Sequence, residues 1–577
     1  MIVEQDVWMS TRDGVRLATD IYRPADGDRH PVLVHRGPYP KDDDAFTVGV
    51  ILDVKATIER GYAIAVQQVR GRYGSEGEWE PVVHEAEDGY DAVEWAAAQP
   101  WSTGDVGIYG SSYLGFTTLQ TLPTRPPHLR AAAALVTSPD LNQGVVRVDG
   151  AFQVGLASWW AGMMMVPDTI ERLDVPESEK AGLRAALGHM TAHPWESIER
   201  LPLDEIEAFS RGAAAYWQTW IREKPDSGYW QAMNVVAQAD RIDVPLLQVA
   251  GWYETFHTVQ LDLHRRLQAD PRHRIIIGPW DHQGAYGAVA GGSTAAGERE
   301  FGPAAESGAT TFTPILLDWF DRWLRSDRPS DGGAPRVRYF QMGDDEWRTC
   351  ETWPPATAET VLYLDSAGNA NTLHGDGSLR TAVPGHPGID IYRYDPRDPA
   401  PTVGGATIHY IYGNAGVYDQ RAVEERPDVL VFTSDELTRP LQVCGRVTAE
   451  LFVSSDAEDT DFTAKLVDVE PSAYAANIGD GIVRCRYRNG GSDDWLTPGR
   501  ITEITVDIGD VAHTFLPGHR VRLELSSSNF PRYSRHLNGR GLPETGRAVD
   551  ARVAEQRIWY GGEHVSRLRL QTTSEGA

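Results

Sequence analysis

The segment around Ser112 has the residue types that a serine nucleophile needs. The run GSSYLG at 110–115 follows a short apolar stretch and precedes a helical pattern, which predicts a strand, a sharp turn and a helix. Such a turn crowds the neighbours of the nucleophile, so the residue two positions before it must be small. Gly110 holds that place for Ser112, whereas a bulky tyrosine holds it for Ser111. Because Leu114 stands where the usual motif has a second glycine, an ordinary glycine-rich turn is the alternative interpretation.

A serine hydroxyl reacts only with a base beside it, and the base needs an acid to orient it. Glu254 and His282 each follow a predicted strand, in the runs GWYETF and GPWDHQ. In open α/β sheets, functional sites lie at the carboxyl ends of such strands. The chain order serine, acid, histidine is the order that hydrolases with this kind of sheet require. We therefore predict a Ser112-His282-Glu254 triad. Asp281 is the rival acid, but its position next to His282 orients it poorly toward the imidazole.

The elements that would carry these residues alternate in type along the first part of the chain. Residues 5–23 alternate apolar and polar around a glycine turn, which predicts an opening hairpin. Later apolar runs and helical patterns indicate a parallel sheet with crossover helices. The expected strands cover 31–35, 63–69, 106–109, 131–136, 245–250 and 274–277, and the expected helices cover 85–99 and 314–325.

Changes in pattern divide the chain into four segments. The expected α/β core covers residues 1–144 and returns at 241–345. Between its parts, residues 145–240 are rich in Ala, Met, Trp and Leu with helical periodicity, which predicts an inserted helical cap. Residues 346–577 carry short alternating runs separated by Gly, Pro, Asp and Asn, which is typical of a β-sandwich. The fold class is therefore α/β, with a cap and a C-terminal all-β domain.

The composition excludes several classes of partner. The chain has 577 residues, with 54 Lys and Arg against 82 Asp and Glu, so its formal net charge is −28. A surface this acidic repels nucleic-acid phosphates and anionic lipids, and no apolar run reaches the roughly 20 residues of a membrane span. Three widely spaced cysteines and the absence of a signal-like N-terminus favour a cytoplasmic protein without disulfides or a cysteine-based zinc site. The sequence leaves open whether the chain is a homodimer.

Several segments together resemble the cocaine-esterase-like hydrolases, a family related to X-Pro dipeptidyl peptidases, glutaryl acylases and α-amino acid ester hydrolases. Besides the three triad segments, the matching runs are VRGRYGSEG at 69–77, DTDFTAKL at 459–466 and SSSNFP at 526–531. The resemblance runs almost end to end and implies an α/β-hydrolase core, a helical cap and a jelly-roll domain. Relatives in this family carry Asp as the triad acid, whereas this chain has Glu254.

The resemblance also implies an oxyanion hole and a substrate pocket. The run RGPY at 36–39 matches the loop whose tyrosine hydroxyl binds the oxyanion, so Tyr39 and the backbone N–H of Tyr113 are the expected donors. Phe256 matches an aromatic wall of the acyl pocket. Further expected walls are Trp159 and Trp160 of the cap, for which packing in the cap core is the alternative, and the stretch 404–410 of the β domain, represented by Ile408.

These features predict a serine hydrolase that cleaves carboxylic esters of bulky or aromatic acids through an acyl-enzyme, without metal or organic cofactor. Its expected partner is a small-molecule ester. The residues after Glu254 are Thr255, Phe256 and His257, so no carboxylate follows the acid to bind an α-amino group. An amidase or X-Pro dipeptidyl peptidase and an acyltransferase would use the same triad and stay open. A binding protein with an inactive core and a carbohydrate-binding β domain is a further alternative.

Overall fold

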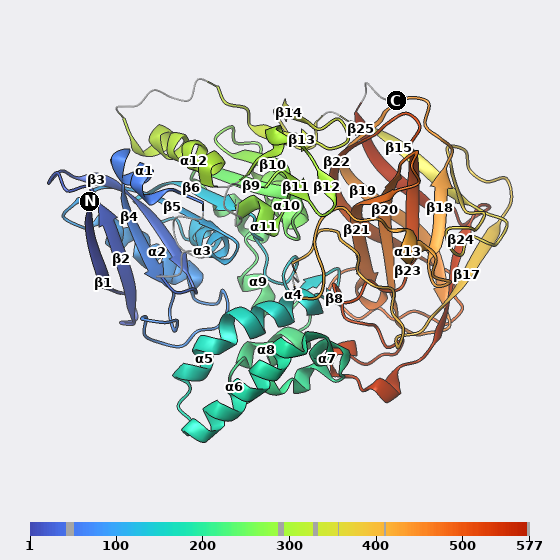
Figure 1. Ribbon diagram of the computed structural model, residues 1–577, viewed down its shortest axis with the longest axis horizontal. Helices are drawn as coiled ribbons and strands as arrows, with labels where there is room; N and C mark the ends of the chain where they lie inside the picture. Colours follow the sequence, from blue (N-terminus) through green and yellow to red (C-terminus); the bar gives the residue numbers. More distant parts are fainter. Residues whose placement is uncertain are drawn as a thin grey trace.

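The computed structural model describes residues 1–41, 51–286, 293–307, 309–326, 333–355, 357–408 and 411–573. In Figure 1 the α/β core, the helical cap and the β domain form three regions that meet near the middle of the molecule. The two parts of the core come from segments on either side of the cap, as the sequence pattern predicts. The fold class is α/β, with a C-terminal β domain.

The core is built on a mixed sheet. Its central strands are parallel, whereas β1, β2 and β14 pair antiparallel at the two edges. The spatial order across the described residues is β1-β2-β4-β3-β5-β6-β9-β10-β13-β14. The bounds are β1 Ile2–Ser10, β2 Arg16–Arg23, β3 His30–Gly37, β4 Ala63–Gln68, β5 Ser102–Ser111, β6 Leu129–Leu135, β9 Leu246–Tyr253, β10 Arg274–Asp281, β13 Val337–Gln341 and β14 Glu346–Cys350.

Helices cover both faces of this sheet. Alternate residues of the central strands face opposite sides, so Val32 and Val34 pack with α2, α3 and α10, whereas Leu33 packs with α1 and α12. Strands buried on both faces must be apolar throughout, which explains the continuous apolar runs of the sequence. The bounds are α1 Val54–Glu59, α2 Glu85–Ala97, α3 Tyr113–Thr121, α10 His257–Leu267, α11 His282–Tyr286 and α12 Ala309–Leu324.

One expected boundary is wrong. The sequence pattern places the start of the β domain at residue 346, but strand β14 pairs antiparallel with β13 at the edge of the core sheet. Residues 346–350 mix polar side chains with Trp347 and Cys350 and are exposed or partly exposed, as an edge strand of either unit would be, so composition alone does not assign them. The first strand of the second sheet is β15, which begins at Thr357.

The cap inserts between β6 and β9 and is almost entirely helical. It begins with a two-stranded hairpin, β7 Arg147–Val148 and β8 Ala151–Phe152, and continues through a helix that changes to a π-helical segment, η3. The later helices lie below the core in Figure 1. The bounds are α4 Val154–Trp159, η3 Trp160–Met165, α5 Val166–Arg172, α6 Glu177–Ala192, α7 Pro194–Glu199, α8 Ala215–Arg222 and α9 Gly228–Ala232.

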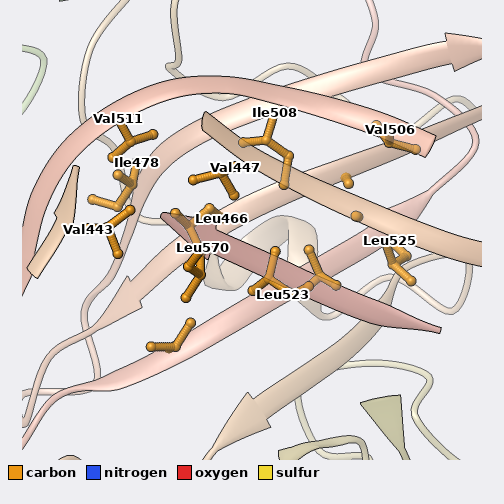
Figure 2. Close-up of a cluster of buried hydrophobic side chains, with 14 of the residues drawn as sticks. Val443, Val447, Leu466, Ile478, Val506, Ile508, Val511, Leu523, Leu525 and Leu570 are labelled. Carbon is orange, nitrogen blue, oxygen red and sulfur yellow. The ribbon is translucent and has the colours of Figure 1, made fainter. Parts of the chain in front are cut away.

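The C-terminal domain is a β-sandwich of mostly antiparallel strands around an aliphatic core. Alternating positions of its strands point inward, and Figure 2 shows Val447, Leu466, Ile508 and Leu523 meeting between the strands. The bounds are β15 Thr357–Asp365, β16 Ser378–Arg380, β17 Gly388–Tyr394, β18 Leu430–Ser434, β19 Leu441–Ser455, β20 Asp461–Val469, β21 Ala475–Arg484, β22 Thr502–Phe515, β23 Arg520–Ser526, β24 Ala554–Tyr560 and β25 Arg567–Thr573, with one short helix, α13 Arg421–Glu424.

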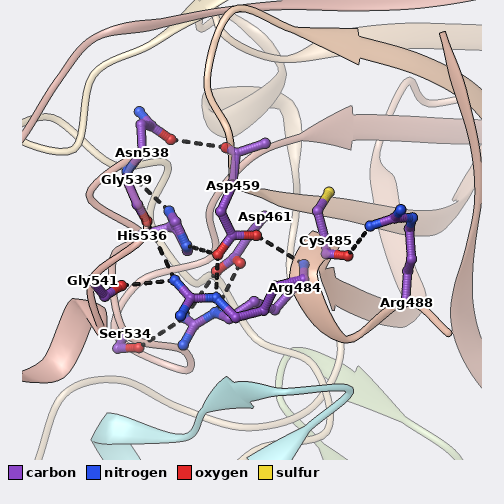
Figure 3. A network of polar contacts seen from close by, with 12 residues as sticks. Asp459, Asp461, Arg484, Cys485, Arg488, Ser534, His536, Asn538, Gly539 and Gly541 are labelled. Atoms are coloured by element: carbon purple, nitrogen blue, oxygen red, sulfur yellow. Dashed lines mark hydrogen bonds and ion pairs between the residues drawn. The ribbon is translucent and has the colours of Figure 1, made fainter. Parts of the chain in front are cut away.

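A buried polar network at one end of the β domain lies next to the start of the cap. Asp459 accepts hydrogen bonds from the His536 imidazole at 2.8 Å and from the backbone N–H of Arg486 at 2.8 Å, and Asp461 pairs with Arg484 at 3.0 Å (Figure 3). The Arg484 backbone N–H also donates to the carbonyl of Asp149 in the cap hairpin. The β domain therefore fixes the point from which the cap helices start.

Candidate active site

Ser112 lies in a strained turn between β5 and α3. Its φ of 51° and ψ of −125° place a non-glycine residue in a rarely occupied backbone region. The turn is tight because the backbone of Leu114 approaches Gly110 closely. A Cβ added to Gly110 would lie 2.2 Å from the carbonyl oxygen of Leu114. A Cβ on Gly115 would lie 2.6 Å from the Thr137 side chain, so this glycine lets α3 pack closely against the sheet. Gly110 is therefore needed for the turn, and Gly115 for the close packing of α3.

The structure brings the three predicted triad side chains together at the ends of β5, β9 and β10. His282 Nε2 lies 3.1 Å from Ser112 Oγ, and His282 Nδ1 lies 2.9 Å from Glu254 Oε1. Both distances are within the range for hydrogen bonds. The carboxylate has no exposed surface and the imidazole is buried, while the three residues are separated by 142 and 28 positions in the sequence. The imidazole is therefore placed to take a proton from the serine.

Glu254, rather than Asp281, holds the imidazole. The second oxygen of Glu254, Oε2, accepts the backbone N–H of Phe256 at 2.7 Å, which fixes the carboxylate in the loop after β9. Asp281 instead accepts the backbone N–H of Gly284 within its own helix turn. Burial raises the pKa of Asp281. Glu254 is one methylene longer than the Asp found in relatives, and its carboxylate reaches the histidine from a loop that ends in a short turn.

The two residues predicted to supply the oxyanion donors belong to one hydrophobic cluster, and both contact Trp160. Tyr39 comes two residues after β3, and its buried hydroxyl accepts a hydrogen bond from Trp160 Nε1 at 3.2 Å. Burial raises the pKa of Tyr39 to about 12, so the hydroxyl keeps its proton at neutral pH. Tyr113 is the first residue of α3, where backbone N–H groups have no acceptor inside the helix. Its phenol is engaged elsewhere, donating to Glu85 at 3.1 Å.

The expected pocket residues belong to, or pack against, the hydrophobic cluster that contains Tyr39 and Tyr113, and Phe256 also contacts the triad. Phe256 packs edge-on against the His282 imidazole, with ring centroids 5.6 Å apart, and against Phe116. Ile408 is buried, and Trp159 and Trp160 are partly buried against the cluster that contains Phe256 and Tyr39. Residues 409 and 410 of the expected β-domain wall lie outside the described residues. The side chains next to the triad are therefore mainly aromatic and aliphatic.

Sequence reasoning missed three aromatic residues that complete this cluster. Trp79 lies 5.9 Å from Trp160 and 5.7 Å from Tyr216 between ring centroids, and Trp220 stacks on Trp160 at 5.9 Å. Tyr216 and Trp220 are four residues apart on α8, a spacing that puts both on one helix face. That spacing is a signal in the sequence, but it does not tell which cluster the face contacts.

Family models and known proteins match this chain over most of its length. Residues 13–284 match the X-Pro dipeptidyl-peptidase (S15 family), and residues 332–569 match the X-Pro dipeptidyl-peptidase C-terminal non-catalytic domain. Cocaine esterase from Rhodococcus sp. (strain MB1 Bresler) is 36% identical over 574 residues, which cover 98% of each chain.

Solved structures match over nearly the whole chain as well. An aminopeptidase from a marine sediment archaeon, Thaumarchaeota archaeon, superposes with a TM-score of 0.80 at 25% identity, covering 99% of this chain and 96% of the other. An α-amino acid ester hydrolase superposes with a TM-score of 0.79 at 25% identity and the same coverage. The core, cap and β domain thus occur together in these relatives.

Proposed function

Since the chain belongs to the S15 family of serine hydrolases, as a relative of cocaine esterase, we propose that it hydrolyses carboxylic esters with Ser112 as nucleophile. The observation that carries this proposal is the pair of contacts from His282, 3.1 Å to Ser112 Oγ and 2.9 Å to Glu254 Oε1. Aromatic side chains beside a histidine-activated serine suit ester cleavage, and this chemistry needs no metal or organic cofactor.

The reaction follows from this geometry. His282 Nε2 takes the proton of Ser112 while Oγ attacks the acyl carbon, and Glu254 stabilises the imidazolium that forms. The Tyr39 hydroxyl and the Tyr113 backbone N–H donate to the oxyanion; one such donor is typically worth about 2.7–4 kcal/mol. His282 then gives its proton to the leaving alcohol. Water, activated by the same imidazole, releases the acid and restores the serine.

The surroundings favour a bulky or aromatic acyl group. Phe256 stands beside His282, and the indole of Trp160 reaches the Tyr39 hydroxyl, so apolar rings flank the place of the acyl carbon. The position after Phe256 is His257, whose ring nitrogens lie 2.7 Å and 3.2 Å from backbone carbonyl oxygens of Glu254 and Asp510. This histidine is held in the protein interior, and the loop offers no carboxylate to an α-amino group.

A panel of substrates tests the function. We expect the purified protein to hydrolyse p-nitrophenyl acetate, butyrate and benzoate, and to act far more slowly on X-Pro p-nitroanilides. The Ser112→Ala variant, which removes only the hydroxyl, should leave background activity. A preference for the anilides would favour the amidase or X-Pro dipeptidyl-peptidase alternative. Ester products with an added alcohol, found by mass spectrometry, would favour the acyltransferase. An active Ser112→Ala variant would contradict the mechanism.

We also propose that the protein acts in the cytoplasm on a small-molecule ester, without nucleic-acid or membrane partners. The net charge of −28 supports this, and Cys350, Cys444 and Cys485 are unpaired. No helix in the described ranges is long and apolar enough to cross a bilayer. A homodimer stays a prediction, which light scattering during size-exclusion chromatography would test.

A further inference from the structure

Trp160 connects the cap to the oxyanion hole. It is the first residue of the π-helical segment η3, which continues helix α4 with about one more residue per turn. Such segments change which side of a helix a residue faces and are frequent at functional sites. Here the Trp160 indole nitrogen lies 3.2 Å from the hydroxyl oxygen of Tyr39, across the boundary between cap and core.

The direction of this hydrogen bond is fixed by chemistry. An indole N–H can only donate, so the Tyr39 oxygen must accept. The bond thus uses a lone pair of the hydroxyl and does not compete for its proton, which Tyr39 needs for donation to the oxyanion. Accepting one hydrogen bond also polarises a hydroxyl and strengthens the bond that it donates. The Trp160 N–H therefore both orients the Tyr39 hydroxyl and makes it a better donor.

The Trp160 ring is held on two sides. It stacks on Tyr113, with ring centroids 5.8 Å apart and planes at 14°, and on Trp220 of α8, at 5.9 Å and 10°. Tyr113 supplies the second oxyanion donor through its backbone N–H. One cap residue thus contacts both residues of the oxyanion hole, and the stacked rings leave the indole little freedom to turn away from Tyr39.

A buried arginine ties together the two segments that carry this hydrogen bond. Arg72 Nε donates to the carbonyl of Pro38, directly before Tyr39, at 3.2 Å. Its Nη1 donates to the carbonyl of Met165, the last residue of η3, at 3.0 Å. The Arg72 side chain is almost fully buried and pairs with Asp168 of α5 at 3.4 Å. The Tyr39 loop and the Trp160 segment are therefore fixed relative to each other.

We propose that Trp160 is a positioning residue of the oxyanion hole. Through this residue, the packing of the cap against the core determines how strongly the Tyr39 hydroxyl donates its hydrogen bond. This inference rests on the proposed ester hydrolysis. It assigns Trp160 a role beyond that of a pocket wall, because the role depends on its N–H and is exerted on the acyl oxygen, which all ester substrates share. The role therefore does not depend on the size of the acyl group.

The Trp160→Phe variant tests this, since it keeps an aromatic ring and removes the N–H. We expect kcat to fall about 2- to 13-fold, the loss that corresponds to one hydrogen bond between neutral groups, with little change in KM. The fall should be the same for acetyl and benzoyl esters. In a Tyr39→Phe background, Trp160→Phe should have no further effect on kcat, because the hydroxyl through which it acts is gone.

Trp217→Phe is the matched control. Trp217 is a buried cap residue whose indole N–H donates to the Leu203 carbonyl at 2.9 Å, away from Tyr39, so kcat should stay unchanged. The inference is overturned if Trp160→Phe leaves kcat unaltered, if its effect grows with acyl size, or if the effect is undiminished in the Tyr39→Phe background.

If Trp160→Phe does not fold, Arg72→Lys tests the same link, since it should lower kcat only where the Tyr39 hydroxyl is present. An equal loss in both backgrounds would overturn the inference. Failure of the proposed function itself would show separately, as absent ester hydrolysis in the unaltered protein.

Discussion

The most specific prediction from the site geometry arises because the two carboxylate oxygens of Glu254 have different partners. Its Oε1 faces His282 Nδ1 at 2.9 Å, and its Oε2 accepts the Phe256 backbone N–H at 2.7 Å. In Glu254→Gln, the N–H of Phe256 requires the amide oxygen at its side, because a backbone N–H can only donate. The amide NH2 group must then face His282, so Nδ1 becomes the acceptor and the ring proton moves to Nε2.

This tautomer is the wrong one for catalysis. Nε2 now carries a proton where it should accept the proton of Ser112. The imidazolium of the transition state also loses its buried negative partner, since Glu254 has no exposed surface. We expect kcat to fall about 10⁴-fold, the loss that follows when the histidine of such a triad is held in the wrong tautomer. That factor corresponds to about 5 kcal/mol of transition-state stabilisation.

Steady-state hydrolysis of p-nitrophenyl butyrate measures this loss, with circular dichroism to show that the variant folds. The control is Asp281→Asn, which alters the neighbouring carboxylate that accepts the Gly284 N–H. It should cost less than about tenfold, the equivalent of one weakened hydrogen bond. The reasoning is refuted if Glu254→Gln keeps kcat within tenfold of the unaltered protein, or if Asp281→Asn causes the larger loss.

Three further outcomes follow from the structure. Tyr39→Phe should lower kcat about 10²- to 10³-fold with little change in KM, as loss of one oxyanion donor does, and equal activity on p-nitrophenyl acetate would contradict the assignment. Phe256→Ala should lower kcat/KM for benzoyl esters about tenfold more than for acetyl esters, because it removes an aromatic contact; an equal loss would show that it acts only through His282. Asp510→Asn should destabilise the protein by about 1–3 kcal/mol in urea unfolding, because it removes the fully buried carboxylate that pairs with Arg265 and Arg446, which keep Asp262 and Asp507 as partners. Burial acts to raise the pKa of Asp510, but these two arginines outweigh it and lower the pKa to about 2. The stabilisation by this carboxylate is therefore complete above its unfolded pKa of about 3.8 and is lost as the pH falls toward 2. This loss is about 2 kcal/mol of the free energy of unfolding, and Asp510→Asn should not show it.

The arrangement of the triad could be predicted from the sequence because each residue follows an apolar strand directly. Parallel strands end at the same edge of a sheet, so Ser112, Glu254 and His282 had to lie near one another once β5, β9 and β10 were identified. Gly110 identified the nucleophile among two adjacent serines for a steric reason that the structure reproduces, since the Leu114 backbone leaves no room for a Cβ.

Other features depend on contacts that the sequence pattern does not encode. Strand β14 mixes polar and apolar residues at a sheet edge, and only its pairing with β13 assigns it to the core. The hydrogen bond from Trp160 to Tyr39 depends on a π-helical register shift and on the placement of the cap against the core. The contacts of Trp79 and Trp220 with the same indole join segments about 140 residues apart in the sequence. Each depends on tertiary packing and not on local periodicity.

The central claim is that Ser112 is the activated nucleophile, and covalent labelling tests it most directly. The protein is incubated with a fluorophosphonate, its intact mass is measured, and the modified peptide is sequenced by tandem mass spectrometry. The account predicts one adduct per chain, located on Ser112, with loss of esterase activity in proportion to labelling and no adduct in Ser112→Ala. An adduct on Ser111 or another residue, or a fully active protein without an adduct, would contradict it.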